Sequence, residues 1–174
     1  MDIDRIPPLK IYLAGSIRDG RPEDIEWREE MISHLSDVAI FLNPLGGKTY
    51  NPDTKEWRMS GIPSTAEAIV GHDFWCVDRA DAVIFNFRAL SEKYPNIGTL
   101  IEFGRTTGRA PGCLIYSIVD PAYTGHENEA MFHLHPFIER NSTVVFQTTV
   151  DCRKFLAGHL RALSGTYPRF GGHV

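Results

Sequence analysis

Glu102 has the surroundings that a reacting carboxylate would need. It lies in the segment Gly98–Gly104, sequence GTLIEFG, which opens an expected helix shortly after the apolar run Ala82–Phe87. In open α/β sheets, ligands bind at the edge where the strands end, so Glu102 is expected near a ligand. A helix N-terminus favours negative charge, and we therefore expect Glu102 to stay ionised at neutral pH. A positioned, ionised carboxylate can act as a nucleophile toward a sugar carbon.

The same segment has a purely structural interpretation. Thr99 and Glu102 have the spacing of a capping box, in which a glutamate at the third helical position bonds back to the N-cap amide. On this segment alone the capping interpretation is favoured. A second carboxylate shifts the balance toward catalysis.

That second carboxylate is Asp73, in a helix expected at residues 64–79. It lies three residues after Val70 and four before Val77, on an apolar stripe that also contains Ala66 and Ile69. An ionised aspartate on a core-facing stripe is costly unless it is paired or functional. A buried aspartate that caps a nearby loop is the structural alternative. Two nearby carboxylates, one ionised and one able to hold a proton, suit glycosidic chemistry.

The elements that would position these residues alternate along the chain, which predicts a parallel α/β sheet. The predicted strands are residues 10–14, 38–42, 81–87, 112–118 and 143–147. The predicted helices are residues 23–36, 64–79, 98–109, 127–133 and 150–163. Residues 45–63 are expected to form a long loop, a length that is uncommon unless the loop is functional. Without a repeat or linker, residues 1–174 are expected to form a single domain.

Composition excludes several classes of protein. The net charge is −4 and no Lys/Arg block is present, which disfavours a nucleic-acid-binding surface. No apolar run approaches the roughly 18 residues that span a membrane. The N-terminus lacks the plan of a signal peptide, and the three distant cysteines are typical of reduced thiols. We therefore expect a cytoplasmic protein.

The loop after the first strand could bind an anion. Gly15 and Ser16 can offer backbone amides to a phosphate or sugar, and Arg18 and Arg21 can pair with an anion. The loop is neither a dinucleotide fingerprint nor a Walker loop. A tight turn with solvated arginines is the structural alternative.

Two further features give weaker indications of function. His133 and His135 form an H-x-H pair without matching carboxylate or cysteine spacing, so we expect a structural or surface role and no metal site. Trp57, in the long loop, is the tryptophan best placed to stack on a base, although aromatic residues are more often part of a core.

Three motifs together resemble those of the nucleoside 2-deoxyribosyltransferases. They are YLAGS at residues 12–16, HDF at 72–74 with Asp81 following, and GTLIEFG at 98–104, and the resemblance spans roughly residues 10–120. It implies a flavodoxin-like five-stranded parallel sheet with helices on both faces, and assembly into dimers or larger homo-oligomers. It also implies cleavage of the N-glycosidic bond of a 2′-deoxynucleoside through a covalent deoxyribosyl-glutamate, and transfer of the sugar to another nucleobase without a cofactor.

The resemblance also implies roles for individual residues. Glu102 matches the nucleophile, Asp73 the residue that handles protons on the base, and Tyr12 a tyrosine beside the nucleophile. Asn141 matches an asparagine that a neighbouring subunit gives to the sugar 5′-hydroxyl. The residues expected to bind substrate are Gly15, Ser16, Arg18, Asn96, Gly98 and Asn141.

Two alternatives remain open. The loop Gly15–Arg21 also resembles that of the 2′-deoxynucleoside 5′-phosphate N-hydrolases, which pass the sugar to water. Asn96 stands where many transferases have an aspartate, and a neutral side chain tolerates a phosphate better. An alternative from another class is a nucleotide-binding sensor without turnover, which fold alone does not exclude. The transferase is the preferred hypothesis, with a nucleoside or nucleotide and a nucleobase as its small-molecule partners.

Overall fold

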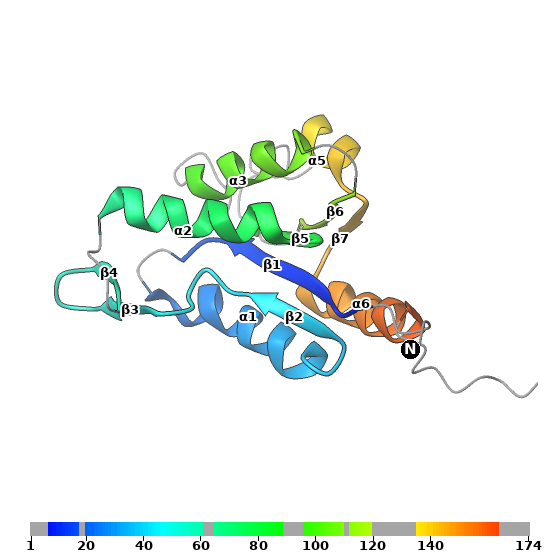
Figure 1. Ribbon diagram of the computed structural model, residues 1–174, viewed down its shortest axis with the longest axis horizontal. Helices are drawn as coiled ribbons and strands as arrows, with labels where there is room; N and C mark the ends of the chain where they lie inside the picture. Colours follow the sequence, from blue (N-terminus) through cyan, green and yellow to red (C-terminus); the bar gives the residue numbers. More distant parts are fainter. Residues whose placement is uncertain are drawn as a thin grey trace, which may run out of the picture.

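The computed structural model describes residues 7–17, 20–60, 65–88, 96–109, 112–119 and 135–163. Within them, five parallel strands form one sheet in the order β2-β1-β5-β6-β7 (Figure 1). These strands are β1 (Leu9–Gly15), β2 (Ala39–Leu42), β5 (Ala82–Asn86), β6 (Leu114–Ile118) and β7 (Val144–Phe146). Counted along the sheet, this is the 2-1-3-4-5 order of flavodoxin-like folds, and the predicted fold class is confirmed.

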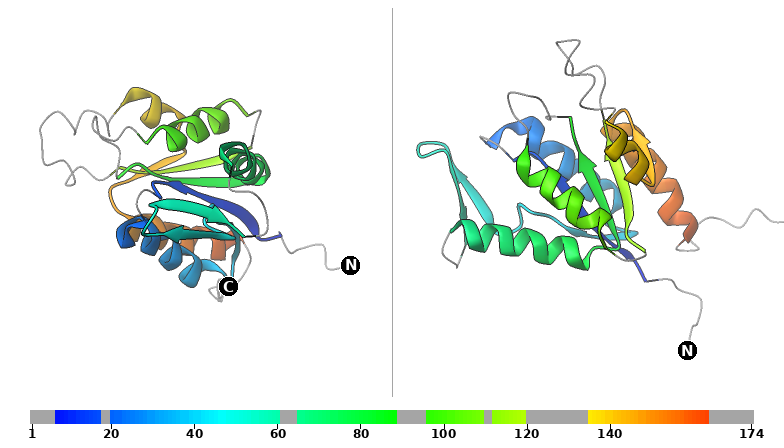
Figure 2. Two further views of the ribbon diagram at one scale, coloured as in Figure 1. Left: turned by 90° about the vertical axis from the view of Figure 1, so that its left-hand side faces the viewer. Right: turned by 90° about the horizontal axis from the view of Figure 1, so that it is seen from above.

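Helices cover both faces of the sheet. On one face lie α1 (Pro22–Leu35) and α6 (Thr149–Leu163), and on the other lie α2 (Ala66–Arg79), α3 (Ile97–Thr107) and α5 (Pro136–Asn141) (Figure 2). Side chains alternate along β1, as the period of a strand requires. Ile11 and Leu13 belong to the core under α1 and α6, whereas Tyr12 and Ala14 belong to the core under α2 and α3.

Local sequence explains where these helices begin. Pro22 occupies the first turn of α1, where its missing N–H is not needed. Thr65 caps α2, and its hydroxyl accepts a hydrogen bond of 3.2 Å from the amide of Ala68. Pro136 begins α5, and the imidazole of His135 accepts a bond from the amide of Phe137. His135 therefore has a structural role, as expected, whereas His133 lies outside the described residues.

The five predicted strands and four of the predicted helices are confirmed, with ends that differ by at most two residues. The helix predicted at 127–133 lies outside the described part of the chain. The six-residue helix α5 was not predicted, because it is too short to show helical periodicity.

The prediction of a long loop at residues 45–63 is wrong. This segment contains an antiparallel hairpin, β3 (Lys48–Asn51) and β4 (Glu56–Met59), that lies beyond the carboxyl ends of the parallel strands (Figure 1). Tyr50 and Trp57 face each other across it, with ring centroids 5.3 Å apart. The two strands are short and polar, so the sequence lacks the apolar alternation that would have predicted them.

The hairpin packs on the loop that joins β1 to α1. The indole Nε1 of Trp57 donates a hydrogen bond of 2.7 Å to the carbonyl of Ile17. The ring of Tyr50 covers Gly20, whose φ of +59° and lack of a side chain permit this close approach. The hairpin therefore fixes the outer side of the loop in which substrate-binding residues were predicted.

Two structural findings bear on the expected class of protein. No helix in the described segments is long and apolar enough to cross a bilayer. Cys76, Cys113 and Cys152 are all free thiols, and Cys76 and Cys152 are buried.

Candidate active site

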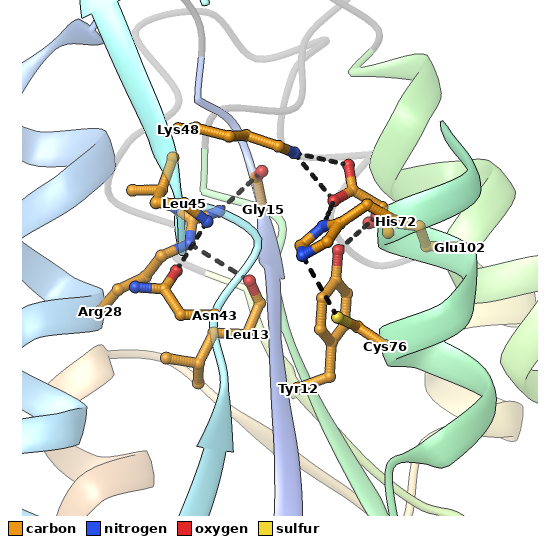
Figure 3. A network of polar contacts seen from close by, with 11 residues as sticks. Tyr12, Leu13, Gly15, Arg28, Asn43, Leu45, Lys48, His72, Cys76 and Glu102 are labelled. Carbon is orange, nitrogen blue, oxygen red and sulfur yellow. Dashed lines mark hydrogen bonds and ion pairs between the residues drawn. The ribbon is translucent and has the colours of Figure 1, made fainter. Parts of the chain in front are cut away.

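The candidate site lies at the point where the strand order reverses. Gly15, the last residue of β1, pairs with Asn86, the last residue of β5. The chain leaves β1 toward α1 on one face, and it returns after β5 to α3 on the other face. Open α/β sheets bind their ligands at this topological switch point. Figure 3 shows the side chains that converge there.

A buried hydrogen bond joins Tyr12 of β1 to Glu102 of α3. The tyrosine hydroxyl donates to Oε1 across 2.7 Å (Figure 3). Tyr12 is fully buried and Glu102 is 8% exposed. The carboxylate is thus held in one orientation at the sheet edge where it was predicted.

The capping-box interpretation of Glu102 is wrong. The N-cap of α3 is Asn96, Thr99 is already the third helical residue, and no acidic residue occupies the first turn. Glu102 lies in the second turn, too far from the N-cap amide to bond to it. Its carboxylate points instead to Tyr12.

The prediction that Glu102 stays ionised at neutral pH is also wrong. Burial raises its pKa from 4.5 to about 7, because few waters remain to solvate the charged form. The Tyr12 hydrogen bond opposes this rise, Asp73 adds to it, and the positive charges of Arg28 and Lys48 oppose it. Near neutral pH, Glu102 therefore exists in both protonation states. Burial and Glu102 raise the pKa of Tyr12, so the phenol stays protonated and keeps donating.

Asp73 faces the same site from α2, but as half of an ion pair. The ammonium of Lys48 lies 2.8 Å from Oδ1 and 3.1 Å from Oδ2, and Nδ1 of His72 lies 3.0 Å from Oδ1. The negative charge of Asp73 raises the pKa of both Tyr12 and Glu102, so the two carboxylates lie near enough to interact. The predicted convergence of Asp73 and Glu102 is thereby supported by electrostatics.

The apolar stripe used to predict the position of Asp73 is only half buried. Val77 is buried, whereas Val70 and Ala66, near the start of α2, are exposed. The loop-capping alternative for Asp73 is not what the structure shows, because its partners are the Lys48 and His72 side chains.

Lys48 was missed in the sequence. Its side chain is 0% exposed, although it comes from a polar segment that looked like a loop. A single lysine in such a segment is normally solvated, and its inward position depends on how the hairpin docks. Nothing in the sequence around Lys48 distinguishes it from a solvated lysine.

Arg28 was also missed. It is fully buried on α1 and donates to the carbonyls of Leu13, Gly15 and Ser16 at 3.2, 2.8 and 3.1 Å. Burial lowers its pKa to about 10, so it remains charged at neutral pH. In the sequence it appears as one of several charged residues of a helix, with no sign that it lies beneath the loop.

Gly15 and Ser16 lie in the loop that Arg28 holds. A Cβ on Gly15 would lie 3.1 Å from the ring of Trp27 and 3.3 Å from the Arg28 guanidinium, so close packing requires glycine here. The hydroxyl of Ser16 donates to Asp24 across 3.1 Å. Arg18, the predicted anion-binding residue of the same loop, lies outside the described residues.

Asn96 and Gly98 begin α3. Asn96 adopts the left-handed conformation, with φ of 47° and ψ of 53°. This conformation is uncommon and costly for a residue other than glycine. Its Nδ2 is buried and finds no hydrogen-bond partner in the described structure. A Cβ added to Gly98 would meet none of the described atoms within 4 Å outside its chain neighbours and its own helix backbone.

Asn141 is not brought to this site within the described structure. It ends α5, is exposed, and donates to the Phe137 carbonyl of its own helix at 2.7 Å. No contact among the described residues joins it to Tyr12, Asp73 or Glu102.

A pocket of about 450 Å³ opens between β4 and the first half of α2, on the side of the candidate site where Asp73 lies. Its lining residues are Glu56, Trp57, Arg58, Ala66 and Ile69. Ile69 lies one helical turn before Asp73, so this pocket and the carboxylate are on neighbouring turns of α2. Among the described residues, no cluster of three His, Cys, Asp or Glu side chains could hold a metal ion.

The fold, the buried Tyr12–Glu102 bond and the facing Asp73 together match what the sequence motifs implied. Residues 8–119 match the family described as nucleoside 2-deoxyribosyltransferase like, and the chain belongs to that family. None of the curated proteins matches the chain in sequence.

Three solved structures share the fold. A 2-desoxiribosyltransferase from Leishmania mexicana has a TM-score of 0.55 and 18% identity, covering 87% of this chain and 99% of that one. A 2-deoxyribosyltransferase from Bacillus psychrosaccharolyticus has a TM-score of 0.54 and 18% identity, covering 87% and 95%. A conserved protein from Enterococcus faecalis has a TM-score of 0.53 and 12% identity, covering 89% and 98%. At these identities the likeness shows the fold alone.

Proposed function

We propose that the protein cleaves the N-glycosidic bond of 2′-deoxynucleosides and transfers the sugar to another nucleobase. The observation that carries this proposal is the buried hydrogen bond between Tyr12 and Glu102, 2.7 Å long, at the topological switch point of the sheet. This bond fixes the orientation of the Glu102 carboxylate, and Asp73 faces the same site from α2. Family membership supports the same chemistry.

In this mechanism Glu102 attacks the anomeric carbon in its ionised form. The C1′–N bond breaks as a C1′–O bond forms, and the product is a covalent deoxyribosyl-glutamate. Tyr12 orients the carboxylate and stabilises its charge before the attack. The departing base takes a proton on the side of Asp73, and the pocket beside Trp57 and Ile69 is large enough to hold that base.

The substrate's 5′ end would meet the loop at Gly15 and Ser16 and the start of α3. The side-chain amide of Asn96 supports this placement, because its buried Nδ2 has no acceptor among the described residues and a substrate oxygen could supply one. A 5′-hydroxyl or a 5′-phosphate oxygen would satisfy it. Because Asn96 carries no charge, hydrolysis of deoxynucleoside 5′-monophosphates is the second candidate function. In that case Arg18→Ala should raise KM for monophosphates and leave nucleosides nearly unchanged.

A homo-oligomer is part of this proposal. Ile97 and Ile101 on α3 are 63% and 52% exposed, and Phe137 on α5 is 71% exposed. Exposed apolar side chains on neighbouring helices are typical of a protein–protein interface. A second copy seated there would also bring the exposed Asn141 of α5 close to another subunit. Sedimentation of Ile101→Glu against wild type would test this, and a fully active monomeric wild type would contradict it.

The experiment that tests the function uses each 2′-deoxynucleoside and its 5′-monophosphate, with and without a free acceptor base, followed by chromatography. Exchange of the base supports the transferase, and release of free sugar or sugar phosphate supports the hydrolase. Glu102→Ala should remove turnover, and a 2-fluoro-2-deoxy nucleoside should label Glu102 covalently. A nucleotide-binding sensor would instead show binding without turnover, unchanged in Glu102→Ala.

A further inference from the structure

A buried cation lies on the carboxylate that faces the departing base. The ammonium of Lys48 contacts both oxygens of Asp73, at 2.8 and 3.1 Å, and its side chain is entirely buried (Figure 3). Asp73 itself is 16% exposed on its side chain. Lys48 belongs to the β3–β4 hairpin, outside the three motifs that carried the family resemblance.

The charges of these two residues depend on each other. Removing an ammonium from water costs several kcal/mol, and a carboxylate partner offsets this cost only while it remains ionised. Among the described ion pairs, Asp73 is the partner of Lys48. If Asp73 held a proton of its own, the ammonium would be a buried charge without a counter-ion. The contacts of Lys48 with both carboxylate oxygens are those of an ammonium–carboxylate ion pair.

We infer that Lys48 is the source of the proton that the departing base receives, passed on through Asp73. This inference rests on the proposed function. An N–H bond of Lys48 breaks as an O–H bond forms on Asp73, and Asp73 gives that proton to the base. At the same time the C1′–N bond breaks, its electron pair stays with the base, and Glu102 bonds to C1′. Lys48 ends as a neutral amine, and an incoming base returns the proton in the second half of the transfer.

The charge balance of the site supports this route. Before reaction the site holds one positive charge on Lys48 and two negative charges, on Asp73 and Glu102. After reaction Lys48 and the esterified Glu102 are both neutral, and Asp73 is still negative. The net charge is −1 in both states, so the buried site gains no unbalanced charge. The positive charge of Lys48 also interacts with Glu102 and lowers the pKa of that carboxyl group.

His72 is the competing source. Its Nδ1 lies 3.0 Å from the same Oδ1, but the ring is 28% exposed and reaches one oxygen, whereas Lys48 reaches both. Among the described residues, the ionisable side chains that interact with this pair include Tyr12, Cys76, Glu102 and the buried Arg28. Tyr12 and Cys76 have raised pKa values and stay protonated, and Arg28 keeps its charge at neutral pH. A His72→Gln variant should therefore lose much less activity than a variant of Lys48.

The test compares Lys48→Arg with wild type on two substrates. Arginine keeps a positive charge beside Asp73 but does not release a proton. On 2′-deoxynucleosides, whose bases need a proton to leave, kcat should fall by about 10²–10⁴-fold. On 4-nitrophenyl 2-deoxyribofuranoside, whose phenolate leaves without a proton, kcat should stay within a few-fold of wild type. Lys55→Arg, an exposed change on the same hairpin, is the control.

Rescue adds a second readout. In Lys48→Ala, small primary amines such as ethylamine should restore nucleoside cleavage, whereas tetramethylammonium, which carries no proton, should not. Equal losses on both substrates would show that Lys48 only positions Asp73 and would overturn the inference, as would an unaffected Lys48→Arg enzyme. If Lys48→Arg does not fold, the Lys48→Ala rescue decides alone. Covalent labelling of Glu102 by the nitrophenyl substrate in wild type tests the proposed function separately, because it needs no proton donor.

Discussion

Tyr12 and Glu102 lie 90 residues apart in the chain, and their side chains meet in a single buried hydrogen bond of 2.7 Å. β1 lies between the two cores, and its side chains point alternately to one and the other. Tyr12 therefore points toward α3. The bond links β1, a strand at the switch point, to α3, the helix that carries the proposed nucleophile Glu102. It also offsets part of the cost of an ionised Glu102 in a buried position.

Tyr12→Phe should therefore move the acid limb of the kcat/KM profile to higher pH. The hydroxyl stabilises the ionised carboxylate, so its loss raises the pKa of Glu102 above its value of about 7. A hydrogen bond to a charged group contributes about 1.5–3 kcal/mol, which corresponds to roughly one to two pKa units. Activity should be reduced most at pH 6–7 and recover toward pH 9. Tyr116→Phe, in the other core, is the control, and an unshifted acid limb in Tyr12→Phe would contradict the assignment.

The free energy of unfolding should depend on the charge of Glu102. Its pKa is 4.5 when solvated and about 7 in the folded protein, so the folded state holds a proton that the unfolded chain has lost between these values. The contribution of this residue to stability is therefore greatest below pH 4.5, falls as pH rises, and levels off above pH 7.

The glutamine of Glu102→Gln cannot ionise, so this variant should not lose unfolding free energy through position 102 as pH rises. The free energies of unfolding of the variant and the wild type, measured with denaturant, should diverge as pH rises. Between pH 4.5 and pH 8 the variant should become more stable relative to wild type by roughly 3 kcal/mol, at about 1.4 kcal/mol per pKa unit. The exposed Glu29→Gln is the matched control. A pH-independent difference would mean that Glu102 is not desolvated in the folded protein.

Arg28→Lys should loosen the loop after β1 although the charge is kept. The guanidinium donates hydrogen bonds to the carbonyls of Leu13, Gly15 and Ser16, and a lysine ammonium cannot reproduce this planar arrangement of donors. A carbonyl left unsatisfied in a buried position costs about 1–3 kcal/mol of unfolding free energy. KM should rise more than kcat falls, because the loop is expected to bind substrate. Arg153→Lys, a change on α6 at a side chain that is 21% exposed and pairs with Glu30, is the control.

Asn96→Asp should distinguish the two candidate substrates. The buried Nδ2 donor is replaced by an acceptor that can be charged, which repels a 5′-phosphate and still accepts a bond from a 5′-hydroxyl. We expect KM for deoxynucleoside monophosphates to rise at least tenfold, about 1.4 kcal/mol, while nucleosides change less. Steady-state kinetics with both substrates would measure these KM values. Equal effects on both would place Asn96 away from the 5′ position.

The sequence predicted the sheet because the central residues of β1 and β5, 11–14 and 82–85, are apolar, as is typical of strands buried on both faces. It predicted Glu102, Asp73 and Tyr12 through motifs, and the structure brings these three together. It did not predict the raised pKa of Glu102, because the position in the helix suggests a stabilised negative charge, whereas burial disfavours that charge more strongly. Lys48 and Arg28 were missed for a related reason. Their burial depends on packing between elements distant in the chain, and neither residue type nor spacing reveals it.

The β3–β4 hairpin has a consequence for how this chemistry could diversify. It delivers Lys48 to Asp73, yet its strands form a separate sheet and pair with none of the described parallel strands. The turn between β3 and β4 can therefore vary without changing the register of the parallel sheet, while Tyr50 and Trp57 keep the hairpin docked on the loop after β1. Under the proposed function, a grafted hairpin with a different residue at position 48 would change which leaving groups are accepted and would leave Tyr12 and Glu102 in place. The proposed nucleophile on α3 and the proposed proton source on the hairpin could then evolve separately.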